Sequence, residues 1–317
     1  YGDDRDLHSF PTRRSSDLSR GDNLSGLLLL DKPQGVTSNE ALQEAKRLLN
    51  ARKAGHTGSL DPIATGLLPL CFGSATKLSG FFLGADKTYW TRIRLGERTA
   101  TGDSEGDVVE KKPVTVSQDD IEKALLNFQG EFLQTPPMYS AVKMNGTPLY
   151  KLARQGIEVE RSPRTVVVYT MELKSFDGLD LELELKCSRG FYVRGLAHDL
   201  GNLLKCGGHV VALRRLVVAD LKIEDAVKLA ELTAVPDLAV RQKILTPIDG
   251  GLSHLPEVRL SADAAFYLCR GQAVRAHGLP NEGQVRLYAK EAGFLGIGMV
   301  TDDGRVTPRR LIPQREK

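Results

Sequence analysis

The stretch Leu179–Leu204 reads LDLELELKCSRGFYVRGLAHDLGNLL, and its hydrophobic period changes in the middle. In the first half, apolar residues alternate with charged ones, as in a strand that buries one face. After Gly190, which permits a turn, the apolar residues follow the 3.6-residue period of a helix as far as Leu204. The stretch therefore predicts a strand followed directly by a helix.

The flanking segments add further elements of both kinds. Strand patterns are SGLLLLDKP, KTYWTRIRLGERT and HVVALRRLVVADL, at residues 25–33, 87–99 and 209–221. Helical patterns cover residues 37–55, with Ser38 or Asn39 as the expected N-cap, and residues 117–130, which open on a Ser117/Asp120 capping pattern. Because strands and helices do not alternate regularly, we predict an α+β fold with a largely antiparallel mixed sheet flanked by helices.

The composition changes after Asp249–Gly251. Short strand patterns then stand between Gly and Pro turns: EVRL, QVRLYAK, FLGIGMV and RVTPRRLI. We therefore expect a larger domain over residues 23–251 and a small β-rich domain over residues 253–317.

The first 18 residues, YGDDRDLHSFPTRRSSDL, lack hydrophobic periodicity and helix or strand punctuation. The string DLHSFPTRRSSDL is what a common sequencing-library adapter gives when it is read in frame. We expect residues 1–18 to be a translated adapter rather than native sequence. A natural disordered basic tail is the alternative.

Several classes of protein find no support in the sequence. The four cysteines contain no C-x-x-C pair, which argues against a zinc site or a disulfide framework and for a reducing, cytoplasmic location. The chain lacks an H-x-x-x-H pair, a phosphate-binding loop, a complete dinucleotide fingerprint and a G-x-S-x-G elbow. It also lacks the roughly 18-residue apolar run of a membrane span. We expect no metal and no cofactor.

Basic residues are clustered although the formal net charge is only +3. Residues 143–164 are rich in Lys and Arg, and two further groups are Arg92, Arg94 and Arg98, and Arg214 with Arg215. Aromatic residues stand among them, which suits a nucleic-acid backbone with bases stacked nearby. Solvated faces of an ordinary protein are the alternative.

Gly55–Gly66, GHTGSLDPIATG, carries a single carboxylate, Asp61, directly before Pro62. Its glycines allow unusual backbone conformations and Pro62 stiffens the chain, while hydroxyl side chains can hydrogen-bond locally. A rigid polar loop of this kind can present a nucleophile, although Asp-Pro is also common in plain turns. His56 can contact a phosphate or a base edge, or have a structural role.

Residues 55–77, GHTGSLDPIATGLLPLCFGSATK, resemble the central motif of the TruB family of tRNA pseudouridine synthases. The resemblance continues through LLLLDKPQGVTS, DKTYW, RLGERTATGDSEG, PPMYSAVKMNGTPLYKLARQGIEVERSPR, CSRGFYVRGLAHDLG and GGHVVALRRL. It implies conversion of uridine 55 in the TΨC loop of tRNA to pseudouridine, without metal or cofactor. It also implies a PUA-like RNA-binding domain at the C-terminus.

The resemblance further assigns site residues. Asp61 matches the essential aspartate, which adds to the base or to the ribose or abstracts a proton. Arg194 matches an arginine expected to lower the pKa of that carboxylate and to orient it through a bidentate fork. Tyr89 matches the active-site tyrosine, which offers a ring face to a flipped uracil and a hydroxyl. Leu213, Tyr192, Lys32 and His56 are expected to contact the substrate.

The ordinary structural alternatives are an exposed helix-face cation for Arg194 and core packing for Tyr89. We expect a monomer that binds the tRNA T-arm, flips the target base and needs no protein partner. Two rivals are a guide-RNA-dependent rRNA enzyme of the dyskerin type and a tRNA-binding folding chaperone without chemistry.

Overall fold

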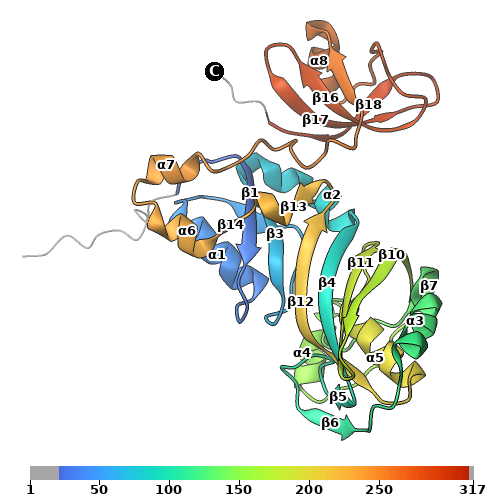
Figure 1. The fold of residues 1–317 in the computed structure, drawn as a ribbon. Helices are drawn as coiled ribbons and strands as arrows, with labels where there is room; N and C mark the ends of the chain where they lie inside the picture. The colour runs from blue at the N-terminus through green and yellow to red at the C-terminus, as the bar shows by residue number, and fades with distance from the viewer. Residues whose placement is uncertain (1–20, 314–317) are drawn as a thin grey trace, which may run out of the picture.

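The computed structural model describes residues 21–313, so the predicted adapter segment at residues 1–18 lies outside the described residues. Its main feature is a ten-stranded mixed sheet with the order β14-β1-β3-β12-β4-β11-β10-β7 (Figure 1). Strands β2 and β13 pair with β3 and β12, off this path. The β1–β14 and β3–β12 pairs are parallel and the others are antiparallel. The predicted α+β fold with a largely antiparallel mixed sheet is confirmed.

The strands of this sheet are β1 (Gly26–Lys32), β2 (Ala54–His56), β3 (Thr65–Phe72), β4 (Lys87–Leu95), β7 (Gly130–Gln134), β10 (Arg164–Phe176), β11 (Asp180–Cys187), β12 (Gly208–Val218), β13 (Leu221–Lys222) and β14 (Val227–Lys228). Two small hairpins are formed by β5 (Glu97–Thr99) with β6 (Val108–Lys111), and by β8 (Lys143–Met144) with β9 (Thr147–Pro148). The helices before the C-terminal sheet are α1 (Ser38–Leu48), α2 (Ser79–Gly84), α3 (Gln118–Leu125), α4 (Leu149–Arg154), α5 (Val193–Leu203), α6 (Leu229–Ala234) and α7 (Leu238–Gln242).

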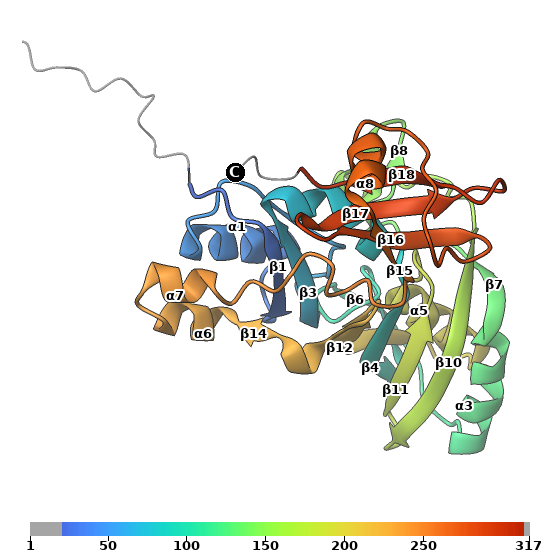
Figure 2. The same cartoon turned by 90° about the horizontal axis from the view of Figure 1, so that it is seen from above.

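Alternation along the strands divides the core between the two faces of the sheet. Leu28 and Leu30 of β1 pack in one cluster with apolar residues of α1, α3 and α5. Their neighbours Leu27 and Leu29 pack on the opposite face, with Phe82 of α2. Figure 2 shows α1, α6 and α7 grouped at one end of the sheet and α3 and α5 at the other. The face that carries α1 and α5 also carries the candidate site.

Local capping explains where two helices begin. Helix α3 begins after Ser117, whose hydroxyl accepts from the Asp120 amide while the Asp120 carboxylate accepts from Ser117, as predicted. The corresponding prediction for α1 is wrong by one or two residues. Thr37 is the N-cap and forms a capping box with Glu40, which places Ser38 inside the helix, where it is buried.

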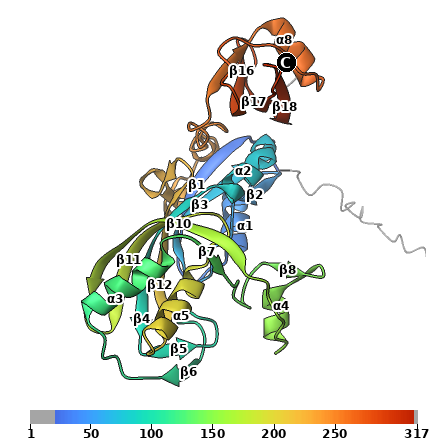
Figure 3. The ribbon, with the colours of Figure 1, turned by 90° about the vertical axis from the view of Figure 1, so that its right-hand side faces the viewer.

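A second sheet follows toward the C-terminus, in the order β15 (Glu257–Leu260), β16 (Gly283–Ala289), β17 (Gly293–Val300) and β18 (Val306–Leu311). All four strands coincide with the predicted patterns, and α8 (Ala262–Cys269) accompanies them. Figures 1 and 3 show this sheet beyond the end of the large sheet where α2 lies, and Figure 3 shows β8 and α4 projecting from the body.

The two sheets share one hydrophobic cluster. Ile297 and Ile312 of the C-terminal part are buried together with Leu27, Leu29 and Phe82 of the larger part. The C-terminal sheet is therefore held by core packing as well as by the connecting chain.

Candidate active site

Asp61 lies in the loop between β2 and β3, which pair as an antiparallel hairpin. We call residues 57–64 the Asp61 loop. The buried Ser38 hydroxyl bonds both the amide and the carbonyl of Leu60, at 2.7 and 3.2 Å. The amide of Gly35 donates to the carbonyl of Pro62 at 2.8 Å, and the amide of Ala64 donates to the carbonyl of Asp61 at 3.0 Å. The loop is therefore held on both sides of Asp61, as a rigid presenting loop requires.

The three glycines of this stretch do not share one role. Gly58 and Gly66 have φ of +127° and +101°, conformations that favour glycine, whereas Gly55 has no such angle and the conformational role predicted for it is wrong. A Cβ on Gly66 would lie 2.8 Å from the backbone nitrogen of Arg215 and closer still to its carbonyl oxygen. Gly66 thus allows β3 and β12 to approach beside the Asp61 loop.

Gly66→Ala should therefore lose more stability than a glycine substitution with the same angle in open space. Gly178 has φ of +102°, and a Cβ added there would have no atom within 4 Å, so Gly178→Ala is the matched control. Both variants have the strain of a positive φ, and Gly66→Ala adds overpacking that costs roughly 1–3 kcal/mol. Urea unfolding of both variants measures the difference in free energy, and equal losses would contradict the packing role.

Arg194 reaches the loop from the first turn of α5 and is 5% exposed. Its Nε contacts an Asp61 carboxylate oxygen at 2.9 Å. Its two terminal nitrogens donate to the carbonyls of Thr101 and Tyr139, at 3.0 and 2.7 Å. The predicted pairing with Asp61 is present, but the predicted bidentate fork is not, because the backbone occupies the other donors. The alternative of an exposed helix-face cation is excluded.

Asp103 is a second carboxylate in the site that sequence reasoning missed. It is 3% exposed, and one of its oxygens lies 3.6 Å from the Arg194 Nε. The hydroxyl of Thr101 and the amide of Glu105 donate to its other oxygen, at 2.5 and 3.1 Å. One guanidinium therefore faces two carboxylates, and the only signal in the sequence was the polar run TGDSEG.

The electrostatics of Asp61 differ from the expectation. Burial raises the pKa of Asp61, Arg194 lowers it and the neighbouring Asp103 raises it again, with a net raised pKa. Arg194 lowers the pKa as expected, but burial outweighs it, with a further contribution from the charge of Asp103. With 39% of its side chain exposed, the Asp61 carboxylate is accessible to a substrate.

These shifts give a testable pH dependence. If the ionised carboxylate of Asp61 is required, activity should rise with pH through a midpoint above the 3.8 of an unperturbed aspartate. Asp103→Asn removes a like charge and should move that midpoint to lower pH. Asp180→Asn, at a surface pair with Arg94, is the control and should not move it. Single-turnover rates measured against pH test this prediction. The same midpoint in Asp103→Asn as in the unmodified protein would contradict it.

Tyr89 lies on β4, opposite Arg215 of β12 and Leu185 of β11. Its side chain is half-buried and packs against the main cluster. Burial raises the pKa of Tyr89, which Arg215 opposes, and the Asp61 carboxylate is near enough to raise it further. The phenol is therefore neutral at neutral pH, and it lies close enough to Asp61 for the carboxylate charge to affect its pKa.

Tyr192, Leu213 and His56 were also predicted to contact the substrate, and each has a different environment. Tyr192 caps α5, and its backbone exchanges two hydrogen bonds with the Gln134 side chain, at 2.8 and 3.0 Å. Leu213 is buried on β12, on the face that Arg215 shares. His56 is half-buried, and burial lowers its pKa. Within residues 21–313, none of these three side chains hydrogen-bonds to the Asp61 carboxylate.

Lys32 is fully buried, and its position does not suit a direct RNA contact in this arrangement. Its ammonium donates to the carbonyls of Pro33 and Val36, at 2.8 and 2.7 Å, and lies 3.5 Å from that of Pro62. Burial lowers the pKa of Lys32 to about 8, against the opposing charge of Asp61. These contacts hold residues 33–36 next to Pro62 of the Asp61 loop.

Two of the three predicted basic clusters are not free cationic surfaces. Arg92, Arg94 and Arg98 pair with Glu182, Asp180 and Glu110 respectively. Arg214 pairs with Asp31, and Arg215 is 1% exposed. The local sequence could not show this, because each partner lies on a different strand or loop.

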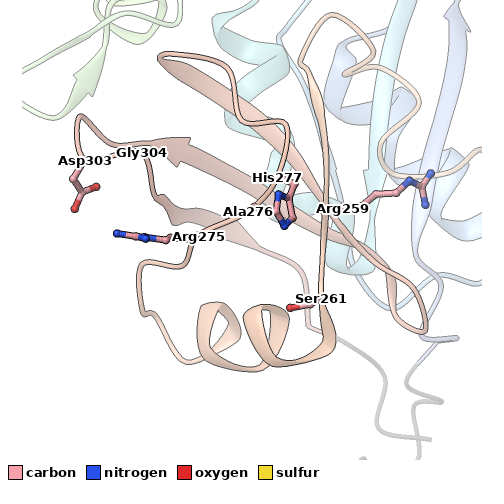
Figure 4. Close-up of a pocket in the computed structure, with 7 residues that line it drawn as sticks. All are labelled: Arg259, Ser261, Arg275, Ala276, His277, Asp303 and Gly304. Carbon is pink, nitrogen blue, oxygen red and sulfur yellow. The ribbon is translucent and has the colours of Figure 1, made fainter.

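A hollow of about 460 Å³ lies away from these residues, beside the C-terminal sheet (Figure 4). Its polar lining includes Arg259, Ser261, Arg275, His277 and Asp303. Figure 4 shows the Arg259 side chain directed away from Arg275 and Asp303. Arg259 pairs with Glu257 and Asp303 with Arg305, so these charges are already engaged.

Within residues 21–313, no group of three or more His, Cys, Asp or Glu side chains is placed to hold a metal ion. No helix in the same range has the length and apolar character needed to cross a membrane.

Family models match most of the chain. Residues 46–193 match the TruB family pseudouridylate synthase N-terminal domain. Residues 194–253 match the tRNA pseudouridylate synthase B C-terminal domain, and residues 256–312 match the C-terminal model of pseudouridine synthase II TruB.

Curated relatives and solved structures agree with these matches. The tRNA pseudouridine synthase B of Coxiella burnetii (strain Dugway) is 52% identical over 296 residues, covering 92% of this chain and 96% of the relative. That of Tolumonas auensis is 48% identical over 303 residues, covering 92% and 94%. An H/ACA ribonucleoprotein bound to a substrate RNA containing 2'-deoxyuridine has a TM-score of 0.68 at 24% identity, covering 92% of this chain and 86% of that one. A Cbf5-Nop10-Gar1 complex has a TM-score of 0.67 at 26% identity, covering 92% and 84%.

Proposed function

Because the chain belongs to the TruB family of pseudouridine synthases and is a tRNA pseudouridine synthase, we propose that it acts on uridine 55 of the TΨC loop. The observation that carries the catalytic part is the Asp61 carboxylate, which is accessible, fixed in a held loop and paired with the buried Arg194. Asp61 is the essential carboxylate of the isomerisation. The uracil detaches from its ribose, rotates and reattaches through C5.

The target uridine is flipped out of its loop, at a cost of a few kcal/mol. Tyr89 offers a ring face against which the flipped base stacks, and the apolar side chain of Leu213 keeps water from the site. Tyr192 shapes the pocket, and His56 contacts the RNA at its edge. The neutral phenol of Tyr89 supports stacking without placing a second negative charge beside Asp61.

Residues 23–251 form the catalytic domain, and residues 253–317 form a PUA-like domain that binds the tRNA outside the T-loop. The distinct C-terminal sheet supports this division. The enzyme acts as a cytoplasmic monomer that grips the T-arm without a guide RNA or a protein partner. Relatives of about half-identical sequence named tRNA pseudouridine synthase B favour this over the guide-RNA-dependent alternative.

Tritium release from tRNA labelled at uridine C5 tests the proposal, because reattachment through C5 expels the hydrogen there. The protein should release tritium from a transcript with uridine at position 55, and a transcript with cytidine at that position and labelled uridines elsewhere should give none. Release from the altered transcript would overturn the site choice. A chaperone without chemistry would release none from either transcript.

A further inference from the structure

Arg215 is a buried cation to which the reaction as described gives no role. It is 1% exposed and has the largest side chain among the fully buried residues. The adjacent Arg214 forms a bidentate pair with Asp31, at 3.0 and 2.9 Å. No ion pair of Arg215 with a carboxylate occurs within residues 21–313. A buried charge without an acid is costly, so its position points to a role other than ion pairing.

The hydrogen bonds of Arg215 hold the chain on both sides of Asp61, and Arg215 lies on the strand next to the one that carries Tyr89. Its Nε donates to the carbonyl of Leu67 at 2.7 Å, and a terminal nitrogen donates to the carbonyl of Gly58 at 3.2 Å. These carbonyls lie on either side of Asp61 along the chain. The guanidinium also lies close enough to Tyr89 to lower the pKa of its phenol, against the larger effect of burial.

The strand register explains how one side chain reaches all of these groups. Strand β12 lies between β3, which follows the Asp61 loop, and β4, which carries Tyr89. Arg215 stands opposite Gly66 on β3 and opposite Tyr89 on β4. Because directly opposed residues project to the same face, Arg215 and Tyr89 lie side by side. Gly66, opposite Arg215 on β3, has no side chain and therefore leaves space for the Arg215 side chain.

We propose that Arg215 is a positioning residue that holds the Asp61 loop and the Tyr89 hydroxyl in one arrangement for the reaction. A guanidinium has donors only, so next to the Tyr89 phenol it can act on the hydroxyl oxygen only as a donor and as a positive charge. The planar fork supplies donors in fixed directions, which a lysine ammonium on a flexible stem does not. The proposal rests on the proposed roles of Asp61 and Tyr89.

The test compares Arg215→Lys and Arg215→Met with Arg214→Lys as the matched control from the same strand. Misplacement of catalytic groups by about 1 Å costs on the order of 10²-fold in rate. Arg215→Lys should therefore lower the single-turnover rate of tritium release about 10²-fold, while the tRNA dissociation constant stays within about twofold of the unmodified protein. Arg214→Lys should keep the rate within about threefold.

A double-mutant cycle with Tyr89→Phe separates positioning from general support of the fold. If Arg215 acts partly through the Tyr89 hydroxyl, Arg215→Lys should cost at least about tenfold less in the Tyr89→Phe background than alone. Equal losses in both backgrounds, an unchanged rate, or a loss equal to that of Arg214→Lys would overturn the proposal. Absence of cooperative unfolding in both Arg215 variants would also overturn it, in favour of a purely structural role.

The same assay distinguishes this inference from the proposed function. If the unmodified protein releases no tritium, the function fails. If it releases tritium at the same rate as Arg215→Lys, only the positioning role fails.

Discussion

Asp61→Asn should lower tritium release by at least about 10³-fold while leaving tRNA binding almost unchanged. Asparagine keeps the shape of the side chain but removes the negative charge on which the proposed reaction depends. The free energy of unfolding should not fall, because burial raises the pKa of Asp61 and its charged form therefore costs stability at neutral pH. Single-turnover release, filter binding and urea unfolding measure the three quantities.

The control for this variant is Asp180→Asn, which removes a carboxylate from a surface ion pair with Arg94. It should retain full release. If Asp61→Asn also released tritium at the rate of the unmodified protein, another group would have to carry the reaction. If it lost binding to the same extent as release, Asp61 would be a binding residue only.

Arg194→Met should lower both activity and stability, because it leaves Asp61 and Asp103 facing each other without a cation. Breaking a buried charge pair costs about 3–5 kcal/mol, and we expect the lower end because part of the Asp61 side chain is exposed. The carbonyls of Thr101 and Tyr139 also lose their donors. Tritium release should fall at least about 10²-fold, since the loop and carboxylate lose their orientation.

The pH dependence of this loss identifies its cause. Protonation neutralises the two unpaired carboxylates, so the difference in unfolding free energy between Arg194→Met and the unmodified protein should shrink as the pH falls. Arg189→Met, an exposed arginine near the same turn, should have little effect on stability at any pH. A loss that is constant with pH would point to lost packing rather than to unpaired charge.

The strands and helices could be predicted because their signals are local. The alternation in β11 and the helical period in α5 each reflect one buried face, and both elements lie where the pattern places them. The N-cap of α1 was missed because threonine and serine stand side by side, and only the backbone geometry selects Thr37.

The charged residues of the site were harder to predict, because their burial depends on partners distant in sequence. Arg215 looked like part of a basic cluster, and its burial depends on the space left by Gly66 and on Tyr89 across the next strand. The raised pKa of Asp61 comes first from burial and then from Asp103, which shares Arg194 with it. Local sequence could therefore indicate Asp61 as a candidate but not its electrostatic surroundings.

The hydrophobic cluster shared by the two sheets has a geometric consequence for RNA recognition. Since Ile297 and Ile312 are buried against β1 and α2, the span from the Asp61 loop to the C-terminal sheet is set by packed side chains rather than by a free tether. If the C-terminal sheet binds tRNA as proposed, only an RNA whose folded shape matches that span contacts both parts at once, and overall tRNA architecture then contributes to selection together with the target loop.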